Sequence, residues 1–135
     1  MIDSEARYGN LRRRKASLFF DCIFYDKWTG SILSSMLHGN RTFNELLEDF
    51  YISPSNLSRV LKKLNKYHLI DRCVIDETPV RIEYAITDCG KECVEMVLGA
   101  HSDFVIKWIP EEVYLDESYY ESLVKNDPLN KRKKP

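Results

Sequence analysis

The chain has 135 residues, of which 44% are hydrophobic and 30% charged, and its formal net charge is −1. This length allows one domain with a buried core, and the near-neutral charge excludes a polycation that binds nucleic acid over its whole surface. The apolar runs are too short for a membrane span and the opening MIDSEARYGNLRRRK lacks the apolar segment of a secretory signal, so we expect a cytoplasmic protein.

The N-terminal part of the chain predicts an arm followed by two helices. Residues 1–14 are polar and end in a run of arginines that Lys15 continues, so we expect a flexible basic arm. Apart from Asp21, residues 18–23 are apolar and aromatic, which suits a buried or interfacial helix. In TGSILSSMLHGN the apolar residues recur at helical spacing until Gly39-Asn40 ends the second helix.

Two short helices and a hairpin follow, each with its own start signal. Thr42 is an N-cap with Glu45 three residues later, which is a capping box. Ser53 caps the next helix, and Pro54 occupies its first position, where a missing N–H costs nothing. The strands IDRCVID and RIEYAIT are joined by the turn ETPV. This order predicts a winged helix-turn-helix, mainly α with a small β-hairpin wing.

The C-terminal part predicts one long helix and an extension. Thr87 or Asp88 caps a helix that runs to about Trp108, and Pro110 ends it. The extension is acidic first and basic last, and we expect a short helix around residues 118–125. Its tyrosines among acids favour an extra packed helix, or alternatively a docking segment for another protein. The predicted divisions are a basic arm (1–14), a DNA-binding domain (15–109) and a C-terminal extension (110–135).

The helix that Ser53 caps concentrates positive charge. The stretch from Pro54 to Leu69 contains four basic residues and no acidic residue. Its apolar residues recur at helical spacing, so the opposite face is polar and positive, as a helix in the major groove requires. An exposed basic face can also be merely solvated, but the caps and the hairpin fit the same DNA-binding architecture.

The positions on this helix predict which residues contact DNA. Residues near a helix N-terminus usually reach the bases, so Ser55, Asn56 and Arg59 are candidates for reading base edges. Asn can bind adenine and Arg can bind guanine through two hydrogen bonds. Phosphate contacts are expected from other basic or helix-terminal residues. The further predicted DNA contacts are Ser53, Lys62, Lys63 and Lys66, Arg41 and Thr42 at the preceding helix start, and Arg72 and Arg81 on the wing.

Three short patterns resemble a known family. They are Lys27-Trp28, R-x-F-x-E-L from Arg41, and P-x-x-x-E-Y-x-x-T-x-x-G from Pro79 to Gly90. Over about residues 20–95 the chain resembles the HxlR-type winged-helix regulators, relatives of the MarR group. The resemblance implies a homodimeric, DNA-binding transcription regulator that dimerises through the first and last helices. The interface residues that it implies here are Leu18, Phe19, Ile23, Phe24, Val94, Val97, Phe104, Val105 and Trp108.

The chain departs from the family pattern at several turns. Two glycines that many members carry before the Lys-Trp pair are Tyr25 and Asp26 here. A turn glycine is Tyr51 and a helix-ending glycine is His68, so we expect these turns to be built differently. The cysteine of redox-sensing members would fall near Lys15, so that oxidant switch does not carry over.

The four cysteines offer alternatives to a DNA-binding site. The four cysteines are interpreted as reduced thiols. Cys89 and Cys93 are spaced as half of a zinc site, but no second cysteine pair completes it, so we expect no metal and no cofactor. Cys22 or Cys89 remains a candidate redox thiol. No catalytic triad order, carboxylate pair or phosphate-binding loop stands out, which argues against an enzyme.

The sequence is therefore compatible with three functions. The first is a regulator that binds double-stranded DNA as a homodimer on a palindromic operator. The second is a winged helix that docks an acidic protein partner through its basic face. The third is a thiol-based redox sensor on the same fold. No membrane partner is expected, and the sequence does not identify an effector.

Overall fold

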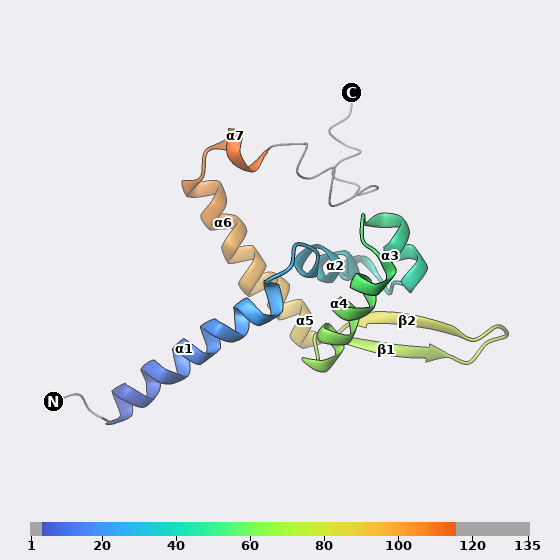
Figure 1. Ribbon diagram of the computed structural model, residues 1–135, viewed down its shortest axis with the longest axis horizontal. Helices are drawn as coiled ribbons and strands as arrows, with labels where there is room; N and C mark the ends of the chain where they lie inside the picture. Colours follow the sequence, from blue (N-terminus) through green and yellow to red (C-terminus); the bar gives the residue numbers. More distant parts are fainter. Residues whose placement is uncertain (1–3, 116–135) are drawn as a thin grey trace.

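The computed structural model describes residues 4–115, and its order of elements is that of a winged helix-turn-helix (Figure 1). Helices precede a two-stranded antiparallel hairpin, and a mostly helical segment follows it. No helix in this part of the chain is long and apolar enough to cross a membrane. The elements are α1 (Ser4–Phe24), α2 (Thr29–Ser35), the 3-10 helix η1 (Met36–His38), α3 (Phe43–Asp49), α4 (Pro54–Lys66), β1 (Ile70–Ile75), β2 (Arg81–Ile86), α5 (Asp88–Glu92), the π-helix η2 (Cys93–Leu98), α6 (Gly99–Trp108) and α7 (Glu111–Tyr114).

The first helix is longer than the sequence predicted. α1 begins at Ser4 and projects away from the body of the molecule, so residues 4–14 are helical where we expected a loose arm (Figure 1). Arginine and lysine are good helix formers, which accounts for a helix through the basic run. At the other end, the helix predicted around residues 118–125 lies outside the described residues.

The start signals of α3 and α4 are confirmed. The Glu45 backbone N–H donates to Thr42 Oγ1 at 3.2 Å, and the Thr42 N–H donates to Glu45 Oε1 at 3.4 Å. The Asn56 N–H donates to Ser53 Oγ at 3.3 Å, and Pro54 is the first residue of α4. Each cap satisfies a backbone N–H that a helix start leaves unpaired, so the start of α4 is fixed by its own sequence.

The core packs around the apolar stripe of α4. Leu57, Val60, Leu61 and Leu64 are buried as predicted, each at most 2% exposed. Burying one such leucine contributes roughly 1.5–3 kcal/mol. Because this face packs inward, the residues on the other side of α4 lie at the surface. The remaining buried apolar residues are Ile23, Ile32, Leu33, Met36, Leu46, Phe50, Ile52, Leu69 and Ile70.

α4 ends in a turn that glycine usually forms. His68 has φ 60°, in the left-handed region. The Leu69 N–H donates to the Leu64 carbonyl at 2.9 Å and the His68 N–H donates to the Asn65 carbonyl at 3.1 Å. These two bonds form a Schellman motif, whose left-handed position favours glycine. His68 therefore adopts the backbone conformation that glycine usually adopts at this turn. Our expectation that the turn is built differently without glycine was wrong.

The hairpin joins the body through a short bridge. β1 and β2 pair in register from Ile70 opposite Ile86 to Ile75 opposite Arg81. Tyr84 extends the pairing to Arg41, with N–H to carbonyl bonds of 2.9 and 2.7 Å in the two directions. This bridge connects the wing to the segment just before α3, so the wing and α3 are held together.

The last helical segment covers the predicted range but is not regular. Thr87 caps it, with the Gly90 N–H donating to Thr87 Oγ1 at 3.0 Å. The π-helix from Cys93 to Leu98 separates α5 from α6, and its turns are wider than those of an α-helix. Gly90 lies against the Leu69 carbonyl, where any Cβ would clash, so this position requires glycine.

Candidate nucleic-acid interface

The exposed face of α4 is polar and basic. Ser55, Arg59, Lys62 and Lys66 are exposed and Asn56 is half-buried. No residue of α4 is acidic, so nothing within the helix offsets these charges. The buried stripe of α4 fixes which side faces out, and the Ser53 cap fixes where the helix begins. This part of the predicted site is therefore brought together on one surface.

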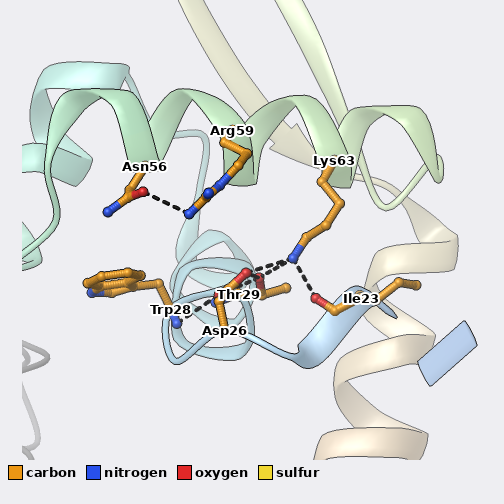
Figure 2. Close-up of polar contacts among 7 residues, drawn as sticks. All are labelled: Ile23, Asp26, Trp28, Thr29, Asn56, Arg59 and Lys63. Atoms are coloured by element: carbon orange, nitrogen blue, oxygen red, sulfur yellow. Dashed lines mark hydrogen bonds and ion pairs between the residues drawn. The ribbon is translucent and has the colours of Figure 1, made fainter. Parts of the chain in front are cut away.

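Two of the predicted base readers are bonded to each other. Arg59 Nη2 donates to Asn56 Oδ1 at 2.7 Å (Figure 2). The carbonyl oxygen of Asn56 is therefore engaged, and its amide N–H₂ group is the part left to contact a ligand. The bidentate contact with adenine that we considered for Asn56 needs both the oxygen and the N–H₂ group. In this arrangement the Asn56–Arg59 pair presents N–H donors to a ligand.

Lys63 lies at the flank of α4, as the sequence allowed, but its ammonium group points into the protein. Its Nζ lies 2.7 Å from Asp26 Oδ2, and its side chain is 15% exposed (Figure 2). The ammonium also donates to the Ile23 carbonyl at 2.6 Å and to Thr29 Oγ1 at 2.9 Å. Lys63 borders the buried stripe of α4, and its long side chain reaches inward across that edge. Our prediction of a phosphate contact at Lys63 is therefore withdrawn.

Asp26 is the acidic partner in this cluster. Its Oδ1 accepts the backbone N–H groups of Trp28 at 3.0 Å and Thr29 at 2.8 Å, at the start of α2. Burial raises the pKa of Asp26 and is the largest single effect. The hydrogen bonds from Lys63, Thr29 and Trp28 together outweigh it and lower the pKa below the ordinary value. The carboxylate is thus held ionised between α2 and α4.

The residues at the start of α3 are less free to bind a phosphate than we expected. The Arg41 guanidinium contacts two acids of α3, Glu45 at 3.6 Å and Asp49, and its side chain is 18% exposed. Thr42 is engaged in the capping box with Glu45. The two acids offset the charge of Arg41, which makes Arg41 and Thr42 weaker candidates for a phosphate contact than the sequence indicated.

The two arginines of the wing are exposed but point apart. Arg72 pairs with Tyr84, while Arg81 pairs with Ile75, which is three residues from Arg72. Side chains alternate between the faces of a strand, so Arg72 and Arg81 lie on opposite faces of the hairpin. Arg81 Nη2 also contacts Glu83 Oε1 at 3.1 Å. The wing therefore presents one arginine on each face rather than a pair on one.

The predicted dimer residues include exposed, half-buried and buried side chains. Leu18, Phe104 and Trp108 are 63%, 56% and 65% exposed, on helices α1 and α6 that extend from the body (Figure 1). Ile23 is buried in the protomer's own core, because the last turn of α1 packs against α2, so it does not line an exposed face. Phe19 is exposed and also contacts Tyr67 edge-on, with ring centroids 4.7 Å apart. The other predicted members, Phe24, Val94, Val97 and Val105, are half-buried.

The cysteines are free thiols in the described part of the chain. Cys22 and Cys89 are exposed, while Cys73 and Cys93 are half-buried. Burial and the neighbouring Cys89 raise the pKa of Cys93, which disfavours its thiolate. Within residues 4–115 no group of three or more His, Cys, Asp or Glu side chains could hold a metal ion.

The cluster around Lys63 is the feature that reading the sequence missed. Two signals were available. Asp26 precedes α2 at the distance of a helix cap, and Lys63 lies three residues after Val60, at the border of the apolar stripe. Neither signal indicates that the two side chains meet, since they are 37 residues apart.

Comparisons with known proteins agree with this architecture. The model of the HxlR-like helix-turn-helix family matches residues 23–113, which is more than half of the chain. The HTH-type transcriptional regulator YvaP of Bacillus subtilis is 38% identical over 88 residues, which cover 64% of this chain and 81% of YvaP. YodB of the same organism is 34% identical over 65 residues, which cover 47% of this chain and 58% of YodB.

Solved structures show the same fold. The reduced form of YodB superposes with a TM-score of 0.60 at 23% identity, covering 81% of this chain and 96% of that one. A MarR-family regulator from Enterococcus faecalis superposes with a TM-score of 0.65 at 20% identity, covering 75% and 92%. The winged helix-turn-helix predicted from the sequence is thereby confirmed.

Proposed function

The chain belongs to the HxlR-like helix-turn-helix family of transcriptional regulators, and we propose that it binds a palindromic double-stranded operator sequence-specifically as a homodimer. Its relatives are regulators and not enzymes, as the absence of catalytic motifs predicted. Under this proposal the protein acts in the cytoplasm, together with the DNA that it regulates.

The exposed face of α4 is the observation that carries the proposal. Ser55, Asn56 and Arg59 lie in its first two turns, where a helix in the major groove reaches base edges. Lys62 and Lys66 lie further along and are suited to phosphates, which add affinity without sequence information. Ser53, which caps the helix, and the wing arginines Arg72 and Arg81 complete the proposed contact surface.

The apolar faces of α1 and α6 support a homodimer. Large side chains such as Leu18, Phe104 and Trp108 are exposed there, and exposed apolar patches of this kind mark interaction sites. A two-fold dimer presents two copies of α4, so the operator should contain two half-sites about one helical turn, roughly 10 bp, apart.

A titration of DNA binding tests this function. Fluorescence anisotropy is measured with the DNA upstream of the protein's own gene and with a scrambled duplex, at two salt concentrations. We expect tighter binding to the upstream DNA, with a steep linear loss on a log–log salt plot. Arg59→Ala and Asn56→Ala should weaken binding mainly to the upstream DNA. Equal binding of both duplexes by all three proteins would instead favour a winged helix that docks an acidic protein.

A thiol-based redox sensor is the second candidate. The exposed thiols of Cys22 and Cys89 are the observation in its favour. A solved neighbour of similar fold is a redox regulator, HypR, whose oxidised form superposes with a TM-score of 0.57. DNA binding by the wild type and by Cys22→Ser/Cys89→Ser would be compared with and without diamide. A response that is equal in both proteins would exclude these thiols as the sensor.

A further inference from the structure

The polar cluster around Lys63 joins the reading helix to the end of α1 and the start of α2. We propose that Lys63 and Asp26 are positioning residues, which set the placement of α4 so that Asn56 and Arg59 reach the bases. The inference rests on the proposed DNA-binding function and assigns to Lys63 a role without phosphate contact. It also gives a role to Asp26, an acid close to a surface proposed to bind DNA.

The ammonium of Lys63 is fully used inside the protein. Its three acceptors are the Ile23 carbonyl at 2.6 Å, Asp26 Oδ2 at 2.7 Å and Thr29 Oγ1 at 2.9 Å (Figure 2). An ammonium has three N–H donors, so none is left over for a phosphate. Its Nζ also lies 5.0 Å from the ring centroid of Tyr25. The charge of Lys63 is thus paired inside the protein, within the polar cluster that connects α4 to the end of α1 and the start of α2. We call this cluster the joint.

Each acceptor belongs to a different part of the joint. Ile23 is in the last turn of α1, where a carbonyl has no partner within its own helix. Asp26 lies in the turn between α1 and α2, and Thr29 is the first residue of α2. One side chain of α4 therefore fixes the end of α1, the turn and the start of α2 together.

The carboxylate of Asp26 divides its two oxygens between two helices. Oδ1 accepts the N–H groups of Trp28 and Thr29 and so begins α2, while Oδ2 faces Lys63 of α4. The Thr29 hydroxyl lies within hydrogen-bond distance of both oxygens, at 2.8 Å from Oδ1 and 2.9 Å from Oδ2. The side chain of Asp26 is 10% exposed, so water screens these bonds little. A change that keeps Oδ1 but alters Oδ2 would therefore separate the capping of α2 from the link to α4.

The base readers lie on the same side of α4 as Lys63. Asn56, Arg59 and Lys63 are spaced at i, i+3 and i+7, and Figure 2 shows their side chains leaving the helix on that side. Binding groups must be held within about 0.5 Å of their productive geometry. Loosening α4 at Lys63 should therefore impair reading of bases more than attraction to phosphates.

Asp26→Asn gives the sharpest test, because a purely electrostatic role and a positioning role of Asp26 predict different effects on DNA binding. An electrostatic role leaves the ratio between operator and scrambled DNA unchanged, whereas a positioning role lowers it. Asparagine keeps an oxygen to cap α2 but places an N–H₂ group against the Lys63 ammonium. Removing a negative charge should strengthen DNA binding if only charge matters. If Asp26 positions α4, the variant should instead lose about tenfold or more of the ratio between operator and scrambled DNA.

Lys63→Met is compared with the matched control Lys62→Met. Both remove one positive charge from α4, but Lys62 is exposed. The control should weaken binding to both duplexes and reduce the log–log salt slope by about 0.9. Lys63→Met should leave the slope unchanged and lower the operator-to-scrambled ratio by about tenfold. The proposal would be overturned if Lys63→Met reduced the log–log salt slope as much as the control does and left the operator-to-scrambled ratio unchanged.

The double variant Asp26→Asn/Lys63→Met separates positioning from folding. It leaves no unpaired buried charge, so its stability should be near that of the wild type. Its ratio between operator and scrambled DNA should stay low, and full recovery of that ratio would overturn the proposal. Amide exchange provides a readout without DNA, since residues 20–29 should exchange faster in Lys63→Met than in Lys62→Met.

The outcomes distinguish the two proposals. If the wild type shows no preference for any duplex, the proposed function fails, while amide exchange still shows whether Lys63 holds the joint. Equal exchange over residues 20–29 in the two lysine variants would refute the joint itself. Faster exchange with an unchanged operator-to-scrambled ratio would refute its role in reading DNA.

Discussion

Lys63 Nζ and Asp26 Oδ2 lie 2.7 Å apart, and they connect α4 to the turn between α1 and α2. The pair is largely buried, with 15% and 10% of the two side chains exposed. A basic residue that the sequence assigned to DNA thus belongs to the interior of the domain. The exposed charge on α4 comes from Arg59, Lys62 and Lys66.

The ionised carboxylate of Asp26 should make stability depend on pH. Its pKa is lowered in the folded protein, so its contribution is present above the unfolded-state pKa of about 3.9 and is lost as pH falls through the lower folded-state pKa. Asp26→Asn should therefore lower the free energy of unfolding by about 1–3 kcal/mol near neutral pH. The difference from the wild type should shrink below about pH 4.

Urea unfolding at about pH 7 and about pH 3 measures this difference. Asp21→Asn is the matched control, because it removes the same charge from an exposed position on α1. A difference between wild type and Asp26→Asn that is equal at the two pH values would show that the ionised Asp26 carboxylate does not stabilise the fold.

The Asn56–Arg59 pair should read the acceptor edge of guanine. Arg59 occupies Asn56 Oδ1, so the pair offers N–H donors, and guanine presents O6 and N7 acceptors in the major groove. After selection of a binding site, replacing its guanines with 7-deazaguanine should weaken binding by about 1–3 kcal/mol per base contacted. Loss of affinity on 7-deazaadenine substitution alone would show that the pair contacts the N7 acceptor of adenine instead of guanine.

The apolar face of α6 should hold the dimer. Trp108→Glu places a charge on a side chain that is 65% exposed in the protomer, so it should shift the mass in solution from two chains to one with little effect on the fold. Light scattering during size exclusion measures the mass. Val74→Glu alters another exposed apolar residue, on the hairpin, and should remain dimeric. A dimeric Trp108→Glu protein would place the interface elsewhere.

His68→Gly should stabilise the protein. His68 has φ 60°, which disfavours any residue with a Cβ by about 1–2 kcal/mol, whereas glycine adopts it freely. The larger entropy of glycine in the unfolded chain offsets part of this gain, which leaves about 0.5–1 kcal/mol. Thermal unfolding measures the change. A lower midpoint for His68→Gly would mean that the imidazole side chain makes contacts worth more than the strain.

Local patterns of the sequence predicted most of the fold. The Thr42 and Ser53 caps, the stripe on α4 and the two strands each depend on residues a few positions apart, and each is present in the structure. The length of α1 was underestimated, because a polar, basic segment has no apolar period although its residues favour helix. The π-helix in the last segment has no recognised signal in the sequence.

The site was predicted less completely, because it depends on contacts between distant residues. Lys63 borders the stripe of α4, and only the folded chain shows that Asp26 lies opposite it. Arg41 has acids at four and eight residues further on, which in hindsight indicated an ion pair. Strand register, which puts Arg72 and Arg81 on opposite faces, requires the length of the turn as well as the strand pattern.

The most direct test of the proposed function is the anisotropy titration of the wild type and Arg59→Ala against upstream and scrambled DNA at two salt concentrations. We expect the wild type to prefer the upstream duplex and Arg59→Ala to lose most of this preference while it keeps weak, salt-sensitive binding to both. Equal binding of the two duplexes by the wild type, unchanged in Arg59→Ala, would contradict a base-reading role for α4.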